Sequence, residues 1–199
     1  MGMKREEQKN QRRALILRAA LDLFIRKGYG ETKIADIAKS ADMSMGLLFH
    51  YFDSKEKLYE ELIRVGCAQL KLDFPSSDVS PLSAFRSFAE SIFDMIASNP
   101  PAAKMFVLME NAQHLDILPN ELKEMLSEAG RLIEDSVPLI LLGQERGEIR
   151  KGDPEALAVA FWCSIQGIAQ HIALYPETRR PDADMLVSIL KSEQINHET

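Results

Sequence analysis

The sequence has few of the residues and patterns that build cross-linked or β-rich proteins. Among its 199 residues there are two cysteines, Cys67 and Cys163. They lie far apart, so we expect two reduced thiols on apolar helix faces and no disulfide framework. Asn-Gly and Asp-Gly pairs are absent and alternating runs are few, which argues against β-hairpins. These absences favour an all-α fold.

Motifs of common catalytic chemistry are also missing. The sequence has no Gly-rich phosphate loop, no His-rich metal cluster and no pattern around a nucleophile. We therefore expect no enzyme activity, no cofactor and no metal ion. The first residues, MGMKREEQKNQRR, are polar and charged and do not resemble a signal peptide. We expect a cytoplasmic protein.

Charged residues are absent from one long stretch. Residues 156–175 contain no Lys, Arg, Asp or Glu, and this is the length of a membrane span. The stretch nevertheless carries Ser164, Gln166, Gln170 and His171, which is a heavy polar load for a lone span. An apolar helix of this kind can instead be buried on two sides, by its own core and by a partner. We favour that interpretation and expect no membrane partner.

The net charge of −6 is unevenly distributed. Residues 1–57 hold 12 Lys and Arg against 8 Asp and Glu, and the remainder holds 12 against 22. A basic N-terminal segment followed by an acidic remainder suits DNA binding by the N-terminal segment. Taken alone, this charge distribution is explained equally well by chance and by ordinary solvated helix faces.

The most informative segment is residues 32–58, TKIADIAKSADMSMGLLFHYFDSKEKL. Ile34, Ile37 and Ala38 give one apolar helical stripe, and Leu48 and Phe52 give a second stripe after a short turn. A helix of about eight residues rarely stands alone in water, so the second helix must lean on its neighbours. This pattern is typical of a helix-turn-helix that places one helix in a DNA groove.

The segment resembles the N-terminal domain of the TetR family of bacterial repressors, and residues 16–29 resemble the first helix of that family. The matching positions are Thr32, Ile37, Ala38, Ala41, Ser44, Gly46, Leu48, Tyr51, Phe52, Lys55, Glu56 and Leu58. Three positions depart from the family pattern: Asp42 replaces a turn glycine, Phe49 replaces a tyrosine, and Ala35 stands where relatives often carry arginine. The resemblance implies a helical body that binds a small molecule and pairs across a two-fold axis.

Helix signals fill the rest of the chain. We expect a first helix at about 9–27, a connecting helix at about 54–73, and body helices at about 80–98, 102–114, 119–145, 154–175 and 182–192. With the helix-turn-helix, this makes about nine helices. The predicted domains are a three-helix DNA-binding domain at 1–57 and a ligand-binding and dimerisation domain at 78–199, with a break at 74–78.

Helix starts offer unpaired N–H groups and a positive dipole end to phosphate. Thr32 and Ser44 precede such starts, where plain capping is the simpler role and can coexist with phosphate contact. Gly46 costs helix stability and suggests close approach of the backbone to a ligand. Tyr51 and Lys55 can contact phosphate, or be a packed tyrosine and a solvated lysine. The predicted DNA-binding residues are Thr32, Lys33, Ser44, Met45, Gly46, Leu47, Phe49, His50, Tyr51 and Lys55.

Met45, Leu47 and His50 fall at variable positions of the family. Met45 and Leu47 can touch thymine methyl groups, and His50 can bond a base edge or a phosphate. For Leu47, packing in the core is an equally good interpretation.

The body offers two further predictions. Small residues on the uncharged helix permit close helix approach, so we expect a homodimer whose interface includes Ala156, Ala160, Ser164, Gly167, Met185, Leu186 and Ile189. Candidate residues around a small, largely apolar effector are Phe85, Phe88, Phe93, Met105, Phe106, Met109, Glu110, His114, Phe161 and Trp162, although each apolar one suits ordinary core packing better. Glu110 and His114 lie four apart and can be polar handles, two metal ligands or, more simply, a surface ion pair.

The leading hypothesis is a ligand-responsive repressor that binds a palindromic, double-stranded operator. The alternatives are a helical ligand-binding or interaction protein without operator binding, and a small helical enzyme.

Overall fold

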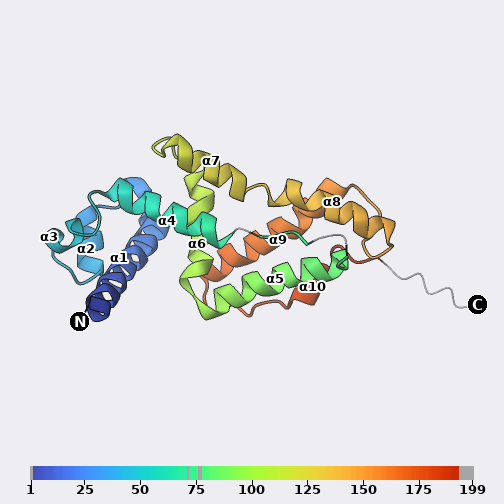
Figure 1. The fold of residues 1–199 in the computed structure, drawn as a ribbon, viewed down its shortest axis with the longest axis horizontal. Helices are drawn as coiled ribbons and strands as arrows, with labels where there is room; N and C mark the ends of the chain where they lie inside the picture. The colour runs from blue at the N-terminus through green and yellow to red at the C-terminus, as the bar shows by residue number, and fades with distance from the viewer. Residues whose placement is uncertain (1, 71, 76–77, 193–199) are drawn as a thin grey trace, which may run out of the picture. The chain divides into compact units, whose positions relative to one another are not determined.

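The computed structural model describes residues 2–70, 72–75 and 78–192, and this part of the chain is helical as expected. Its ten helices are α1 (Gly2–Glu31), α2 (Ile34–Ser40), α3 (Met45–Phe49), α4 (Lys55–Gln69), α5 (Pro81–Ser98), α6 (Pro101–Ala112), α7 (Asn120–Ala129), α8 (Leu132–Glu145), α9 (Pro154–Leu174) and α10 (Ala183–Val187) (Figure 1). In these residues the one extended pairing is an antiparallel bridge between Ile149 and Lys191.

Five of the ten described helices start after a residue whose side chain caps them. The side chains of Ser44, Ser54, Ser80, Asp153 and Asp182 each accept a hydrogen bond from a backbone N–H in the first turn that follows. Such bonds satisfy donors that the helix itself leaves unpaired. A proline follows both Ser80 and Asp153, where its missing N–H costs nothing. The starts predicted at these residues are confirmed.

Helix lengths differ from the prediction in five places, one of which is α4, which ends at Gln69 rather than near residue 73. The first helix begins at Gly2 rather than near residue 9. The helix expected at 119–145 is two helices, α7 and α8, separated at Gly130. Helix α3 has five residues instead of about eight, and α10 ends at Val187 instead of near residue 192.

The chain divides into two compact units that do not follow the sequence order. The first comprises Met1–Leu70 and Pro101–Leu126, and the second comprises Lys71–Pro100 and Ser127–Thr199. Helix α6 and most of α7 therefore group with the N-terminal helices, although they fall inside the predicted 78–199 domain. The functional division at 1–57 and 78–199 stays a prediction.

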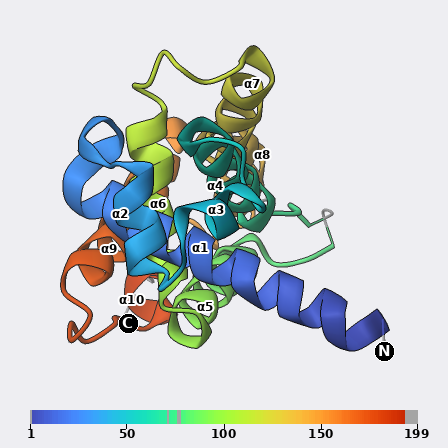
Figure 2. The same ribbon diagram turned by 90° about the vertical axis from the view of Figure 1, so that its left-hand side faces the viewer.

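The core of the first unit forms around α1. Its residues Ile16, Ala20 and Phe24 are almost fully buried, and α1 packs against α2, α4 and α6. The first turns of α1 run out past α2 and α3 (Figure 2). Helices α4 and α6 lie so close together that a Cβ added to Gly66 would stand 2.6 Å from Met109 Sδ. This packing fixes the base on which α2 and α3 rest.

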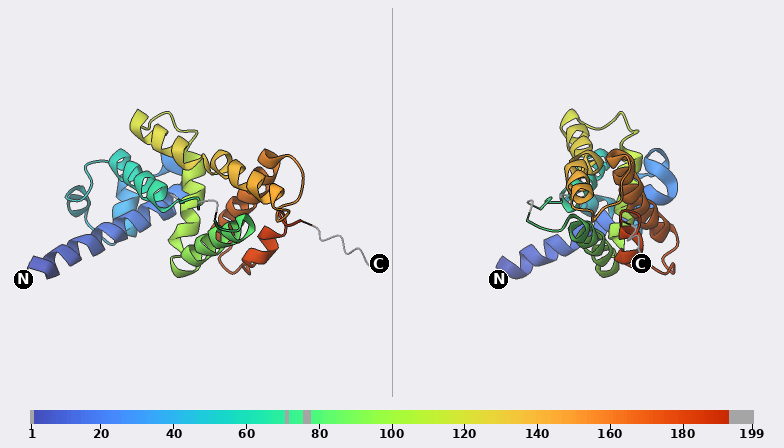
Figure 3. Two further views of the ribbon diagram at one scale, coloured as in Figure 1. Left: turned by 45° about the vertical axis from the view of Figure 1, so that its right-hand side comes forward. Right: turned by 90° about the vertical axis from the view of Figure 1, so that its right-hand side faces the viewer.

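The second unit is a bundle of α5, α8, α9 and α10. Helix α8 packs along α9 and α5 packs along α10 (Figure 3). An aromatic cluster fills its centre, with the rings of Phe85 and Phe161 4.9 Å apart. Trp162 Nε1 donates a hydrogen bond to Ser136 Oγ at 3.0 Å, which satisfies both buried polar groups.

Helix α9 is long and apolar enough to cross a membrane by length and composition, and no other helix of the described residues is. This is weak evidence, since core helices of soluble proteins meet the same criterion. The structure shows where its apolar residues go. One side, with Phe161, Trp162 and Ile165, is buried in the second unit, and the opposite side is exposed.

Candidate nucleic-acid interface

The turn between α2 and α3 is a well-formed helix C-cap. Asp42 has a φ of 54°, in the left-handed region that aspartate visits more readily than most residues. Met43 N–H donates to Ala38 O at 2.9 Å and Asp42 N–H donates to Lys39 O at 3.2 Å. These two bonds form a Schellman motif, which ends α2 and redirects the chain. Aspartate thus performs the role for which the family pattern has glycine.

Helix α3 is held by its inner face and open on its outer face. Leu48 is fully buried and Phe52 is 4% exposed, so both are core residues as predicted. Ser44 Oγ accepts a hydrogen bond from Leu47 N–H at 3.2 Å and caps the helix. On the outer face Met45 is 37% and Phe49 is 43% exposed. A short helix presented in this way can place side chains against another molecule.

Gly46 lies on the same outer face. It is exposed, and a Cβ added there would meet no heavy atom within 4 Å. Packing inside the chain therefore does not require glycine at this position. That is the result expected if the missing side chain serves contact with another molecule.

Thr32 corrects one prediction. It is 1% exposed, and its hydroxyl donates to Gly28 O at 2.7 Å with Leu23 O 3.3 Å away. The residue at the start of α2 is Lys33, and it forms no side-chain cap. Thr32 is thus neither a cap nor a surface donor. Its hydroxyl instead lies against backbone carbonyl groups at the point where Gly28 interrupts the helical geometry of α1.

Lys55 also has an internal role that the sequence did not reveal. Its Nζ donates to Tyr29 O at 2.8 Å and to Thr32 O at 3.0 Å, and lies 4.1 Å from the centre of the Tyr29 ring. Two of its three N–H donors are therefore used within the unit. Lys55 joins the start of α4 to the end of α1 and is first a positioning residue.

Tyr29 and Glu56 complete this junction. Tyr29 Oη donates to Glu56 Oε1 at 2.9 Å. Burial and this hydrogen bond raise the pKa of Tyr29. The pKa of Glu56 is lowered, chiefly by its own backbone N–H and then by Ser54 and Tyr29, because all three donate to the carboxylate. The junction holds the ends of α1 and α4 in a fixed geometry beside α2 and α3.

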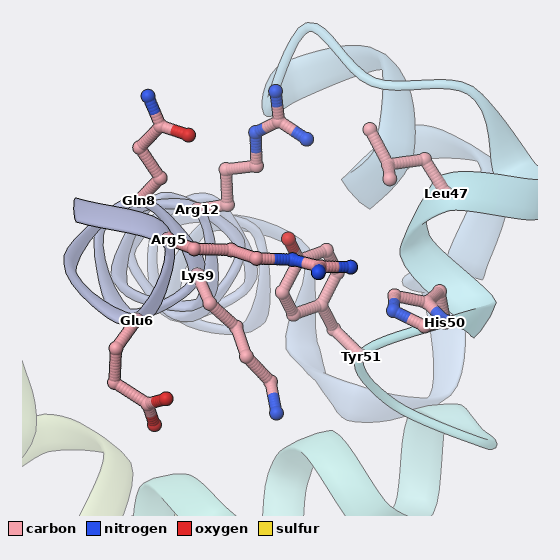
Figure 4. Close-up of a pocket in the computed structure, with 8 residues that line it drawn as sticks. All are labelled: Arg5, Glu6, Gln8, Lys9, Arg12, Leu47, His50 and Tyr51. Carbon is pink, nitrogen blue, oxygen red and sulfur yellow. The ribbon is translucent and has the colours of Figure 1, made fainter. Parts of the chain in front are cut away.

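The structure brings α3 together with residues that the sequence pattern did not single out. Leu47, His50 and Tyr51 line a groove of about 680 Å³ whose other side is the first part of α1 (Figure 4). On that side stand Arg5, Glu6, Gln8, Lys9 and Arg12. The signal for this side was present in the sequence, because basic residues spaced by four and then three share one helix face.

The predicted effector residues do not fall in one unit. Phe85, Phe88, Phe93, Phe161 and Trp162 are buried in the second unit. Met105, Phe106, Met109, Glu110 and His114 belong to the first unit, where the two methionines pack against Gly66 and His114 is exposed. Effector binding by these residues stays a prediction.

Known proteins give the same picture of the N-terminal region. Residues 16–62 match the sequence profile described as "Bacterial regulatory proteins, tetR family". The N-terminal region of the chain is therefore similar to the DNA-binding domain of TetR-family regulators. The match covers the helix-turn-helix together with the packed part of α1 and the first half of α4.

Relatives in the TetR family extend the similarity beyond the profile. The chain is 29% identical over 170 residues to the HTH-type transcriptional regulator RutR of Escherichia coli K12, covering 83% of this chain and 77% of RutR. It is 30% identical over 115 residues to the HTH-type transcriptional repressor KstR2 of Mycobacterium tuberculosis, covering 56% of each. The structure of AibR with isovaleryl coenzyme A and operator DNA shares the fold, with a TM-score of 0.64, 20% identity and coverage of 90% and 98%.

Proposed function

We propose that this chain is a one-component transcriptional repressor that binds a palindromic operator as a homodimer and leaves it when a small molecule binds. The observation that carries the proposal is the capped, outward-facing α3, whose glycine serves no packing inside the chain. Relatives named as regulators and repressors support this function, and AibR is described with both operator DNA and a ligand. By the same family relation, we expect a cytoplasmic protein without enzyme activity.

In this proposal α3 enters the major groove with its outer face toward the bases. Met45 and Phe49 offer apolar contact to thymine methyl groups, and His50 offers a ring nitrogen to a base edge or phosphate. Gly46 lets the backbone come close to the DNA. Ser44 Oγ accepts from Leu47 N–H and still has its own proton to donate to a phosphate.

Phosphate contact next to α3 falls to fewer residues than the sequence suggested. Lys33 is exposed at the start of α2 and keeps its proposed role. The Thr32 hydroxyl is withdrawn from the proposal because it is buried and bonded. Lys55 keeps one N–H donor for such a contact, and Tyr51 and Leu47 are half-buried beside the groove.

The proposed dimer rests on the exposed side of α9. Along this side Ala156, Ala160 and Gly167 are exposed, and a Cβ on Gly167 would meet nothing within the chain. Small residues at this spacing allow a second helix to approach closely. Leu174 and Met185 are 61% and 64% exposed and extend the apolar surface. Leu186 is removed from the predicted interface, because it is 4% exposed and packs within its own chain.

The effector releases the dimer from DNA if ligand and operator favour different spacings of the two N-terminal DNA-binding domains. Each then lowers the affinity for the other by the same factor. The aromatic cluster of Phe85, Phe88, Phe161 and Trp162 suits a largely apolar molecule, as do the methionines and Phe106 of α6.

Selection of duplexes from a random pool tests this function. The wild type is expected to recover a palindrome whose half-sites lie about one helical turn apart, or a multiple of it. Met45→Ala and His50→Ala are each expected to relax the preference at a base pair, at about 1–3 kcal/mol. Gly30→Ala is a matched control, because Gly30 lies in the same unit, is exposed and has open space around it. An unchanged consensus for both α3 variants would contradict the assignment of α3.

A further inference from the structure

The first turns of α1 form a helix that nothing in the core explains. Every residue from 5 to 12 is exposed, and the first buried residue after them is Ile16. A helical segment without tertiary support is marginal in water. These turns also lack an acidic residue in the first turn, where it would suit the helix dipole.

Charge makes this segment still less favourable on its own. Arg5 and Lys9 stand four apart and Lys9 and Arg12 three apart, so like charges are neighbours on one face. In the described part of the chain none of the three forms an ion pair. Arg13 differs, because it binds Glu61 at 2.7 Å and lies over the Phe52 ring. One basic residue fastens α1 to the core and three are left facing solvent.

These three cations line the same groove as His50 and Tyr51, next to the end of α3. In Figure 4, Arg5 extends toward His50 and Tyr51, while Arg12 and Lys9 stand on either side of it. The carboxylate of Glu6 points away from His50 in this view. The groove therefore combines three cations with an imidazole and a phenol, and its one acid turns outward. That set suits an anion that runs along the helix.

We propose that Arg5, Lys9 and Arg12 bind the phosphodiester backbone of the operator on the strand that passes the C-terminal end of α3. This inference rests on the proposed function and extends it to the opposite rim of the major groove from Ser44 and Lys33. The three residues span about 10 Å of helix, and B-DNA places one phosphate per about 3.4 Å of axis on each strand. Residues 5–12 of α1 thus span several phosphates along one edge of the major groove in which α3 contacts the bases.

The test compares a triple variant, Arg5→Gln, Lys9→Gln and Arg12→Gln, with a control of equal charge change, Arg150→Gln, Lys151→Gln and Arg179→Gln. The control residues are exposed and lie in the other compact unit. The probe is a duplex of about 40 bp recovered by the wild-type chain from a random pool, long enough for two half-sites and their flanks. Affinity is measured by fluorescence anisotropy over a series of salt concentrations, and circular dichroism checks that each variant is folded.

The triple variant is expected to show a shallower dependence of log affinity on log salt. The slope should fall by about 0.9 for each phosphate that the variant no longer neutralises, or by up to about 5 for both DNA-binding domains of a dimer. Base preferences should stay the same, because phosphates carry no sequence information. Arg5→Lys with Arg12→Lys should keep most of the slope. Neutral methylphosphonate linkages beside the half-sites should weaken the wild type and leave the triple variant unaffected.

Three results would overturn the inference. A triple variant with the slope of the control shows that α1 does not touch phosphate. A changed preference at flanking base pairs shows that these side chains read bases instead. Equal sensitivity of wild type and triple variant to the methylphosphonates places phosphate binding on other residues. A wild type that recovers no duplex overturns the proposed function itself, which separates the two failures.

Discussion

At the scale of single residues, Thr32 and Lys55 hold together the junction between the end of α1 and the start of α4. The Thr32 hydroxyl donates to Gly28 O, and Lys55 Nζ donates to Tyr29 O and Thr32 O. These partners lie where Gly28 interrupts the helical geometry of α1, so no local sequence pattern reveals them. Ser44, Leu48 and Phe52 have the roles that their pattern predicts, because capping and core burial depend on near neighbours in the chain.

Lys55→Met should therefore act mainly on stability. The variant keeps the aliphatic chain and loses hydrogen bonds to two carbonyl groups, at about 1.5–3 kcal/mol of unfolding free energy. Lys33→Met is the matched comparison, since Lys33 is exposed and forms no cap. Urea denaturation and salt-dependent DNA binding separate the two roles. We expect Lys55→Met to lower stability with most of its salt slope kept, and Lys33→Met to do the reverse. If Lys55→Met instead kept its stability and lost salt dependence, Lys55 would be a phosphate-binding residue.

Glu56 should make the stability of the first unit depend on pH. Its pKa is lower in the folded chain than its ordinary value of 4.5, so the folded state favours the ionised carboxylate. The stabilisation is fully present above the ordinary value and is lost as pH falls through the lowered pKa. Glu56→Gln should therefore be less stable than the wild type near about pH 7, with the difference shrinking below about pH 4. A difference that stays constant across this range would show that ionisation of Glu56 has no part in it.

At the scale of helices, the sequence predicts the starts that carry a capping residue better than it predicts helix lengths. Capping residues and prolines mark the starts of α4, α5 and α9, because these signals are local. Lengths depend on packing and turn geometry. The helix expected at 119–145 divides at Gly130, and α1 continues seven residues beyond its expected start. The basic groove was missed for the same reason, since it needs α1 and α3 side by side.

Close packing of α8 gives a prediction at this scale. A Cβ on Gly143 would stand 2.5 Å from Ile149 Cδ1 and 3.1 Å from Ile149 Cβ, and Ile149 is 1% exposed. Gly143→Ala should lower the unfolding free energy by about 1–3 kcal/mol through overpacking. Gly30→Ala, with open space around it, should be neutral or stabilising by up to about 1 kcal/mol. Thermal unfolding of both variants measures the difference. Equal stability of the two variants would mean that α8 and Ile149 shift enough to accept the added methyl group without cost.

At the scale of the whole molecule, function is proposed to depend on two copies. The exposed side of α9 supplies the surface, with Ala160 and Gly167 at its centre. Ala160→Glu or Gly167→Glu would bury an unpaired charge in a close-packed interface, at a cost of several kcal/mol. We expect these variants to sediment as monomers and to bind half-sites singly. Arg150→Glu is the control, because Arg150 is exposed and lies outside α9. Intact dimers of both α9 variants would move the interface elsewhere.

Operator recognition by α3 is tested most sharply by one titration that yields affinity, specificity and stoichiometry together. The wild type is titrated against its selected palindrome and against a scrambled duplex at two salt concentrations. We expect a preference of at least about 10³ for the palindrome, an affinity that falls steeply with salt, and two chains bound per duplex. Equal affinity for both duplexes, or an affinity indifferent to salt, would contradict the claim that α3 reads an operator.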